Sequence, residues 1–162
     1  DDIFRQVRRT ISLPMLRKDF TVDEYQIYQA RLMGANAVLL IVSLLDGETL
    51  KGYLDLCRSL GLAALVETHD GQEVDAALNA GAEIIGVNNR NLKDFSVDFS
   101  NAARLRDRIP PGVLYVAESG LTGPEDAAAL KRLGADAALV GEALMRAPDK
   151  GAMLASLRRA AE

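Results

Sequence analysis

The stretch GAEIIGVNN, residues 81–89, decides the fold, because it holds a helix stop, an apolar run and a polar end in direct succession. A glycine such as Gly81 ends a helix when it takes the left-handed conformation. A continuous apolar run is typical of a strand of a parallel sheet that is buried on both faces. The same Gly-Ala pair precedes apolar runs at residues 34–35 and 134–135, and this weak internal repeat predicts a recurring helix–strand unit.

Six apolar runs recur along the chain, and their first residues lie 21 to 30 positions apart, which is the length of one strand and one helix. They cover residues 13–16, 37–42, 62–66, 83–87, 113–117 and 136–140. Helical patterns lie between and after them, over residues 22–33, 49–60, 72–80, 98–108, 125–133 and 151–161. Repeated units of this kind predict a parallel sheet, either open and doubly wound or closed into a barrel.

Polar residues at the end of nearly every run favour the barrel, since a doubly wound sheet gathers such residues at one switch point. A complete (β/α)8 barrel has eight units and about 250 residues, whereas this chain has 162. We therefore expect one α/β domain over residues 1–162: a (β/α)8 TIM barrel lacking its first two strands, with strands 3–8 present and an N-terminal helix before them. The first residue is Asp1, not Met, which indicates a processed, excised or trimmed chain.

Composition excludes several classes of function. The 19 Lys and Arg residues against 23 Asp and Glu give a net charge of −4, so the surface is not a basic field for nucleic acid or anionic membrane. No apolar run reaches the roughly 18 residues of a membrane span, and no charged-then-apolar leader opens the chain. A single cysteine, Cys57, excludes an internal disulfide framework. We expect a cytoplasmic protein without a metal site, a nucleic-acid partner or a membrane partner.

The first run is followed by charged residues at its end. Strand alternation places Leu16, Lys18 and Phe20 on one face and Arg17 and Asp19 on the other. If Leu16 points into the barrel, Lys18 is an ammonium group at its mouth, where it can donate a proton or pair with an anion. A solvated Arg-Lys-Asp turn explains these residues equally well.

Glu67 extends an otherwise apolar run, and such a carboxylate is costly to bury without a partner. With Lys18 two strands away, the two side chains can form an acid and a base of opposite charge. The alternative is that Glu67 is the first polar residue of a loop. His69, the single histidine, lies where a loop leads into a helix, so we expect it to cap or pack.

Three further polar ends follow later runs. Asn88 and Arg90 carry groups that bind hydroxyls and carboxylates, although an asparagine-rich turn also fits. Glu118 precedes a small Ser119-Gly120 pair whose N–H groups can approach an anion. The loops after the last two strands of such barrels commonly hold phosphate, which adds Gly141 and the backbone of Glu142, provided that the Glu142 side chain points away.

Taken together and in order, six motifs resemble the indole-3-glycerol-phosphate synthase family of tryptophan biosynthesis. They are LRKDF (16–20), VLLI (38–41), LVETH (65–69), GVNNRNL (86–92), AESGL (117–121) and LVGE (139–142). The likeness covers the C-terminal three quarters of that family's barrel. It implies an enzyme without metal or organic cofactor that acts on 1-(2-carboxyphenylamino)-1-deoxyribulose 5-phosphate. That reaction closes the indole ring with loss of carbon dioxide and water.

The resemblance also implies roles for single residues. Lys18 would protonate the substrate carbonyl during ring closure, and Glu67 would be the acid/base of the dehydration. Asn88 and Glu118 would hold the substrate hydroxyls and the ammonium group. Arg90 would contact the anthranilate carboxylate or order the rim. The remaining implied contacts are apolar walls at Phe20 and Leu39, for which a plain core role is nearly as good, and phosphate contacts at Ser119, Gly120, Gly141 and the backbone of Glu142.

One departure from the family is large. Its first strand supplies another glutamate and another lysine, and a following serine contacts phosphate, but this sequence has no counterpart of them. We therefore expect the isolated chain to be inactive and to self-associate through two open strand edges. Two other interpretations stay open at this point. One is another phosphate-binding barrel, such as an isomerase of aminated ribulose phosphates, and the other is a catalytically silent fragment or assembly module.

Overall fold

The computed structural model describes residues 1–90, 98 and 100–162. Within them, helices and strands alternate along the chain, as the spacing of the apolar runs predicts. The helices are α1 (Asp2–Thr10), α2 (Glu24–Met33), α3 (Gly47–Ser59), α4 (Gly71–Ala80), α5 (Ser100–Arg106), α6 (Pro124–Arg132), α7 (Glu142–Arg146) and α8 (Lys150–Ala160), with a short 3-10 helix at Val42–Leu44. The strands are β1 (Leu16–Arg17), β2 (Ala37–Ile41), β3 (Ala63–Thr68), β4 (Ile84–Asn88), β5 (Leu114–Glu118) and β6 (Ala137–Leu139).

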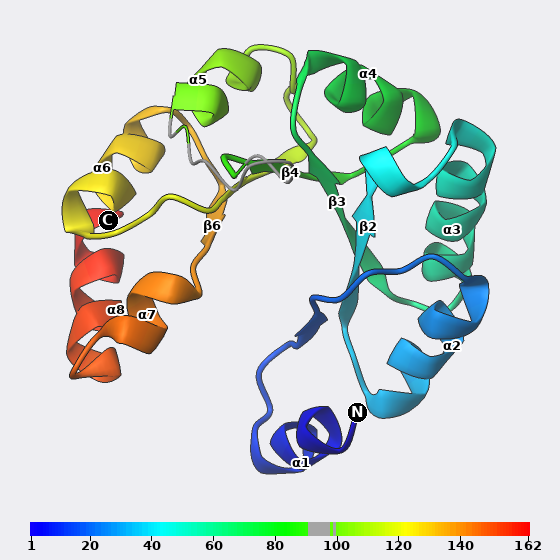
Figure 1. The fold of residues 1–162 in the computed structure, drawn as a ribbon, viewed down its shortest axis with the longest axis horizontal. Helices are drawn as coiled ribbons and strands as arrows, with labels where there is room; N and C mark the ends of the chain where they lie inside the picture. The colour runs from blue at the N-terminus through cyan, green and yellow to red at the C-terminus, as the bar shows by residue number, and fades with distance from the viewer. Residues whose placement is uncertain (91–97, 99) are drawn as a thin grey trace.

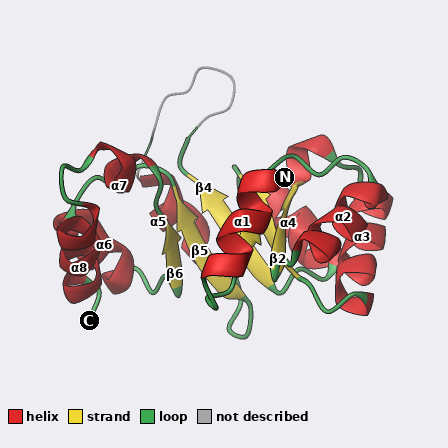
Figure 2. Ribbon diagram, turned by 90° about the horizontal axis from the view of Figure 1, so that it is seen from below, coloured by secondary structure: helices red, strands yellow, loops and turns green. Residues whose placement is uncertain are grey.

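The six strands form one parallel sheet in the order of the sequence, β1-β2-β3-β4-β5-β6. The sheet curls into an arc with helices along its outer side (Figure 1), and the view from below shows the strands between two groups of helices (Figure 2). A doubly wound sheet reverses its strand order at a switch point, and no reversal occurs among these strands. The expectation of a partial (β/α)8 barrel is confirmed.

Alternation along the strands separates two apolar layers. Val38, Leu40 and Val66 point outward into the core between sheet and helices. Leu39 and Leu65 point inward and form a smaller cluster with Ile41, also of β2, and with apolar residues of the other strands, namely Leu16, Ile84, Val116 and Leu139. Because both faces of the sheet are apolar, the strands have the continuous apolar sequences that are typical of parallel sheets.

Capping geometry confirms the helix stops predicted at Gly34 and Gly81. The Asp70 side chain accepts hydrogen bonds from the backbone N–H groups of Gln72 and Glu73 at 2.9 Å, and it thereby caps α4. Gly34 and Gly81 end α2 and α4 with φ angles of +88°, in the left-handed region that glycine adopts without strain. No helix among the described residues is long and apolar enough to cross a membrane.

The first strand is displaced from the predicted run 13–16. Pro14 has no N–H to donate to a ladder, and the Met15 carbonyl accepts the N–H groups of Asn36 and Ala37. Regular pairing with β2 therefore begins only at Leu16, opposite Ala37. The apolar run at 62–66 likewise differs from β3, which continues through Glu67 and Thr68. This extension matters for function because it carries a carboxylate into the sheet.

Candidate active site

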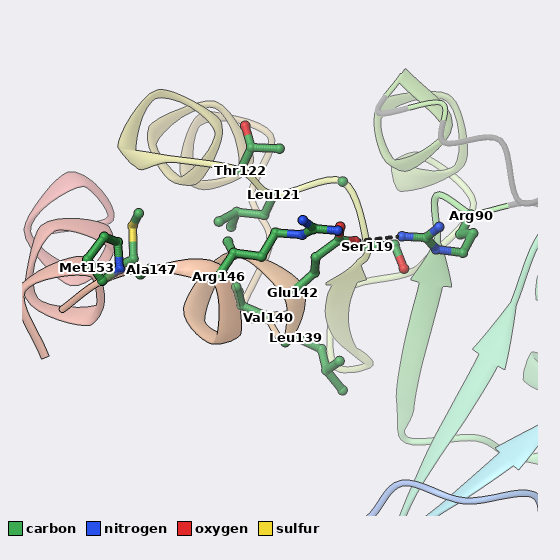
Figure 3. Close-up of a pocket in the computed structure, with 14 residues that line it drawn as sticks. Arg90, Ser119, Leu121, Thr122, Leu139, Val140, Glu142, Arg146, Ala147 and Met153 are labelled. Carbon is green, nitrogen blue, oxygen red and sulfur yellow. Dashed lines mark hydrogen bonds and ion pairs between the residues drawn. The ribbon is translucent and has the colours of Figure 1, made fainter. Parts of the chain in front are cut away.

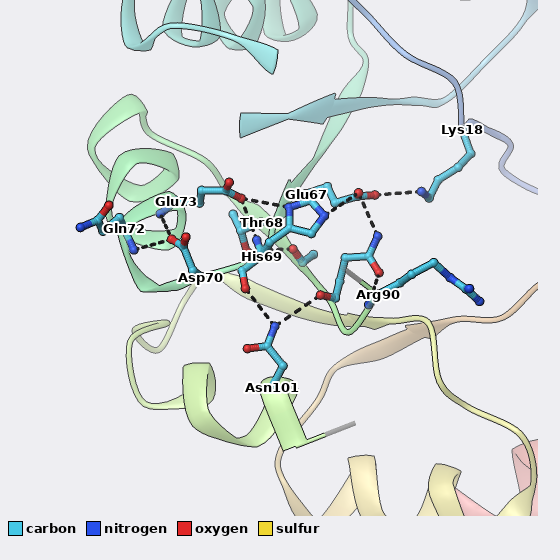
Figure 4. A network of polar contacts seen from close by, with 11 residues as sticks. Lys18, Glu67, Thr68, His69, Asp70, Gln72, Glu73, Arg90 and Asn101 are labelled. Carbon is cyan, nitrogen blue, oxygen red and sulfur yellow. Dashed lines mark hydrogen bonds and ion pairs between the residues drawn. The ribbon is translucent and has the colours of Figure 1, made fainter. Parts of the chain in front are cut away.

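The carboxyl ends of β1, β3, β4 and β5 bring four of the predicted site residues together. Lys18 Nζ lies 2.9 Å from Oε2 of Glu67 and 3.3 Å from Oε2 of Glu118. Asn88 Nδ2 donates a hydrogen bond of 2.9 Å to the other oxygen of Glu67, Oε1. Figure 4 shows Lys18 reaching Glu67 from one side of the network. One ammonium group is thus shared by two carboxylates from different strands.

Burial raises the free-energy cost of charge on these side chains. The side chains of Glu67 and Glu118 are only 2% and 1% exposed, while that of Lys18 is 35% exposed. Burial opposes the charge of Lys18, but the nearby Glu118 and Glu67 carboxylates outweigh it and raise the Lys18 pKa. A cation held in this way remains charged at neutral pH, where it can stabilise a developing oxyanion.

The pKa values of the two carboxyl groups are shifted in opposite directions. Burial and the neighbouring Glu67 charge raise the pKa of Glu118 to about 7, against the attraction of Lys18. Burial alone would also raise the pKa of Glu67, but hydrogen bonds from Asn88 and Lys18 outweigh it and lower that pKa. Two neighbouring carboxyl groups with different pKa values can serve as the acid and the base of one reaction.

Gly86 makes the space that Glu118 occupies. A Cβ atom at Gly86 would lie 2.0 Å from Oε1 of Glu118 and 3.2 Å from Cδ1 of Leu65. Within the described part of the chain, neither carboxylate oxygen of Glu118 has a hydrogen-bond partner, so packing and the ammonium of Lys18 hold it. Gly86 was not among the predicted site residues, although a glycine inside a strand is itself a signal of close approach by another group.

His69 lies where the end of β3 leads into α4. Its ring lies between Glu67 and Glu73, with Nε2 3.5 Å from Oε1 of Glu67 and Nδ1 3.1 Å from Oε2 of Glu73 (Figure 4). We expected His69 to cap or pack. Its spacing of two from Glu67 is the signal that the sequence offered, since alternate residues of an extended segment share a face.

Two buried asparagines tie the strand ends together. Asn89 donates from Nδ2 to the Ser119 carbonyl at 3.0 Å, and its Oδ1 accepts the N–H of Ala102. Asn101 donates from Nδ2 to the His69 carbonyl at 3.0 Å. These bonds connect β4 with β5, and α5 with the end of β3. Their partners are distant in sequence, so a reading of local pattern could not identify them.

A pocket of about 660 Å³ lies beside this cluster, between the ends of β5 and β6 and the helices α7 and α8. Its lining includes the predicted phosphate positions Ser119, Gly120, Gly141 and Glu142, together with the predicted carboxylate-binding Arg90 (Figure 3). Ser119 and Gly120 have φ angles of +63° and +83°. The left-handed region is uncommon for serine and is often found where a ligand is bound.

The Glu142 carboxylate is held between two arginines. Arg90 Nη2 lies 3.1 Å from Oε2 of Glu142, and Arg146 Nε lies 2.9 Å from Oε1. The pocket lining therefore has two cations and one carboxylate, which offsets only part of their charge. Arg146 was missed in the sequence analysis; it follows Glu142 by four residues, which is the spacing of helical ion pairs.

The two predicted apolar walls lie in different surroundings. Leu39 is 3% exposed and belongs to the inward-facing cluster, whereas Phe20 is 59% exposed in the loop after β1. Asn91 and Leu92 of the GVNNRNL motif lie outside the described residues. No group of three or more potential metal ligands occurs among the described residues.

The profile of the family described as indole-3-glycerol phosphate synthase matches residues 1–157. The chain belongs to this family. A synthase of that name from Ruminiclostridium cellulolyticum is 53% identical over 161 residues, which are 99% of this chain and 62% of the relative. Indole-3-glycerol phosphate synthase 2 of Streptomyces coelicolor is 54% identical over 150 residues, which cover 93% of this chain and 58% of the relative. The chain thus spans about 60% of the length of these relatives.

Solved structures support the barrel fold of this synthase family member. The chain aligns with 3-hexulose-6-phosphate synthase from Salmonella typhimurium with a TM-score of 0.83 and 15% identity, over 98% of this chain and 78% of that one. Thiamine phosphate pyrophosphorylase from Pyrococcus furiosus gives a TM-score of 0.75 and 18% identity, over 99% and 74%. At these identities the likeness concerns the fold alone.

Proposed function

We propose that this chain carries the ring-closing centre of an indole-3-glycerol-phosphate synthase. The reaction converts 1-(2-carboxyphenylamino)-1-deoxyribulose 5-phosphate into indole glycerol phosphate, with loss of one carbon dioxide and one water. The observation that carries the proposal is the ammonium of Lys18 within 3.3 Å of two buried carboxylates at the mouth of the barrel. Membership of the family supplies the substrate class.

Lys18 protonates the substrate carbonyl while the aryl carbon attacks it. The charge that develops on the carbonyl oxygen is stabilised by a cation that its neighbours already hold in place, so little reorganisation is needed at the moment of reaction. Carbon dioxide then leaves the carboxyl-bearing ring carbon. Arg90, which lines the neighbouring pocket, binds that carboxylate or orders the rim before its loss.

Glu67 is the acid/base residue of the dehydration, in which a ring proton and a hydroxyl group leave as water. Its lowered pKa makes it a carboxylate that can accept a proton. Asn88 and Glu118 hold the substrate hydroxyls and the ammonium of Lys18. Phe20 and Leu39 form apolar walls for the aromatic ring.

The phosphate group binds in the pocket beside this centre. Ser119, Gly120, Gly141 and the backbone of Glu142 line it, and the Glu142 side chain is engaged by Arg90 and Arg146. Backbone N–H groups in such turns are suited to phosphate oxygens. The partner is accordingly a small phosphorylated molecule that a cytoplasmic enzyme binds, and the net charge of −4 disfavours a nucleic-acid or membrane partner.

Residues 1–162 form a single partial barrel that self-associates and is inactive alone. Among the described residues the sheet ends at β1 on one side and at β6 on the other, and neither edge has a further strand beside it. Helix α1 also exposes Ile3 and Val7. Exposed strand edges and an exposed apolar stripe favour pairing between copies.

The test is a fusion in which the part of the R. cellulolyticum relative that this chain does not cover is joined ahead of Asp1. We call this fusion the completed chain. Ring closure is followed by the appearance of indole fluorescence, with circular dichroism as the control for folding. We expect turnover by the completed chain and none by residues 1–162. A folded completed chain that isomerises aminated ribulose phosphates, or that turns over neither substrate, would refute the proposal.

A further inference from the structure

His69 approaches Glu67 from the side opposite Lys18. Lys18 Nζ contacts Oε2 of Glu67, whereas His69 Nε2 lies 3.5 Å from Oε1 (Figure 4). The His69 side chain is 17% exposed, and its Nε2 atom is buried without a hydrogen bond to any described residue. A buried ring nitrogen that faces a carboxylate at this distance calls for an explanation, because unpaired buried polar groups are rare.

The ring is fixed by a second carboxylate. Glu73 Oε2 accepts the backbone N–H of His69 at 2.7 Å and lies 3.1 Å from its Nδ1 atom. The His69 carbonyl accepts a hydrogen bond from Asn101 Nδ2 at 3.0 Å. Backbone and ring are thus both held, so the direction of Nε2 toward Glu67 is set by α4 and α5.

Chemistry favours the cationic ring in this position. Ionised carboxylates only accept hydrogen bonds, and a neutral imidazole has a proton on one nitrogen only. A neutral ring would therefore direct a lone pair at either Glu67 or Glu73. With both nitrogens protonated, each carboxylate faces an N–H group.

The surrounding charges act in the same direction. The hydrogen bond to Glu73 is the main cause that raises the pKa of His69, and the charges of Glu73, Glu67 and Glu118 add to it against the effect of burial. These carboxylates belong to α4, β3 and β5, whereas the contact from α5 is the uncharged Asn101.

We propose that His69, held by Glu73, is a positioning residue that places a positive charge against Oε1 of Glu67 and keeps this carboxylate ionised. Glu67 then lies between two cations, Lys18 and His69, whereas among the described residues Glu118 has an ion-pair contact with Lys18 and none with His69. This asymmetry assigns the base to Glu67 and the more readily protonated group to Glu118. The inference rests on the proposed function only where it treats Glu67 as the acid/base residue.

The first experiment needs no substrate. The chain has one histidine, so nitrogen-15 NMR of residues 1–162 reports a single imidazole whose shifts give both its protonation state and its tautomer. We expect a titration midpoint above the ordinary value of 6.5, and a lower midpoint in both Glu73→Gln and Glu67→Gln. The control Glu83→Gln changes an exposed carboxylate of the loop before β4 and leaves the midpoint in place.

A midpoint at or below 6.5 in the unaltered chain would overturn the proposal, and that result requires no variant to fold. A midpoint that falls in Glu73→Gln but not in Glu67→Gln would also overturn it, because His69 would then pair with Glu73 alone. Neither outcome depends on turnover.

The second experiment uses the completed chain. His69→Gln keeps a neutral N–H group near Glu67 but removes the charge, so the pKa of Glu67 rises and the acid limb of the kcat profile moves to higher pH. KM changes by less than about twofold, since the ring does not bind substrate. An unmoved acid limb in an active, folded His69→Gln variant would contradict the proposed role. A completed chain without any turnover would refute the proposed function and leave the NMR result standing.

Discussion

The α-carbon of Gly86 faces the carboxylate of Glu118 so closely that a methyl group there would lie 2.0 Å from Oε1. The two residues are on adjacent strands, and Glu118 is buried, so the carboxylate cannot move aside without a local rearrangement. Gly86→Ala is therefore expected to destabilise the fold by roughly 1–3 kcal/mol. It is also expected to lower kcat of the completed chain at least about tenfold, because Lys18 loses one of its two carboxylates. Urea unfolding and indole fluorescence measure the two effects.

Gly52→Ala is the matched control for this substitution. Gly52 lies in α3, where an added Cβ has no atom within 4 Å. Alanine is the better helix former by up to about 1 kcal/mol, so this variant gains stability and keeps its turnover. If Gly86→Ala behaves in the same way, the space above Gly86 is not needed by Glu118.

Glu118 gives the stability a pH dependence with a defined sign. Its pKa is raised from 4.5 to about 7 in the folded chain, so the folded state keeps a proton that the unfolded state has lost. The stabilisation from this proton is fully present below pH 4.5 and is lost as the pH rises to about 7. The pKa of Glu67 is lowered from 4.5 in the folded chain. Its carboxylate therefore contributes stability that is present above pH 4.5 and is lost as the pH falls below that value.

Glu118→Gln imitates the protonated carboxyl group and removes this dependence. We expect the variant to be more stable than the original chain at pH 8, by on the order of 1–3 kcal/mol, and not at pH 4. The measurement is urea unfolding at both pH values and at one protein concentration, with the exposed Glu125→Gln as control. Equal stability of Glu118→Gln and the original chain at pH 8 would show that Glu118 is not held as a proton-retaining group.

The open sheet predicts concentration-dependent assembly. The β1 and β6 edges and the apolar residues of α1 are exposed in the 162-residue chain. Sedimentation velocity is expected to show dimers or larger species for residues 1–162, and monomers for the completed chain, whose added strands cover the edges. A chain of 162 residues that stays monomeric across the accessible concentration range would contradict this.

The sequence predicted the fold because strand burial and helix capping are local properties. Continuous apolar runs marked the six strands of the described sheet, and Gly34 and Gly81 marked helix ends that the structure confirms. The first strand was placed too early because an apolar run alone does not show where pairing begins. Pro14 and the contacts of Met15 with Asn36 delay it to Leu16.

The cluster of Lys18, Glu67, Asn88 and Glu118 followed from one geometric rule, that parallel strands end at a common rim. The roles of Gly86 and His69 could not be predicted from this rule. They come from contacts with side chains whose exact positions the sequence pattern does not show. Gly86 matters only because Glu118 lies over it. His69 matters because Glu73, in the first turn of α4, fixes its ring toward Glu67.

The central claim is that Lys18 is the proton donor of ring closure, and kcat of Lys18→Ala in the completed chain tests it most directly. The variant is expected to lose at least about a hundredfold in kcat, with a modest change in affinity for a phosphorylated substrate analogue. Lys51→Ala, which removes an exposed lysine of α3, keeps full turnover. A folded Lys18→Ala variant with kcat within about twofold of the original would contradict the account.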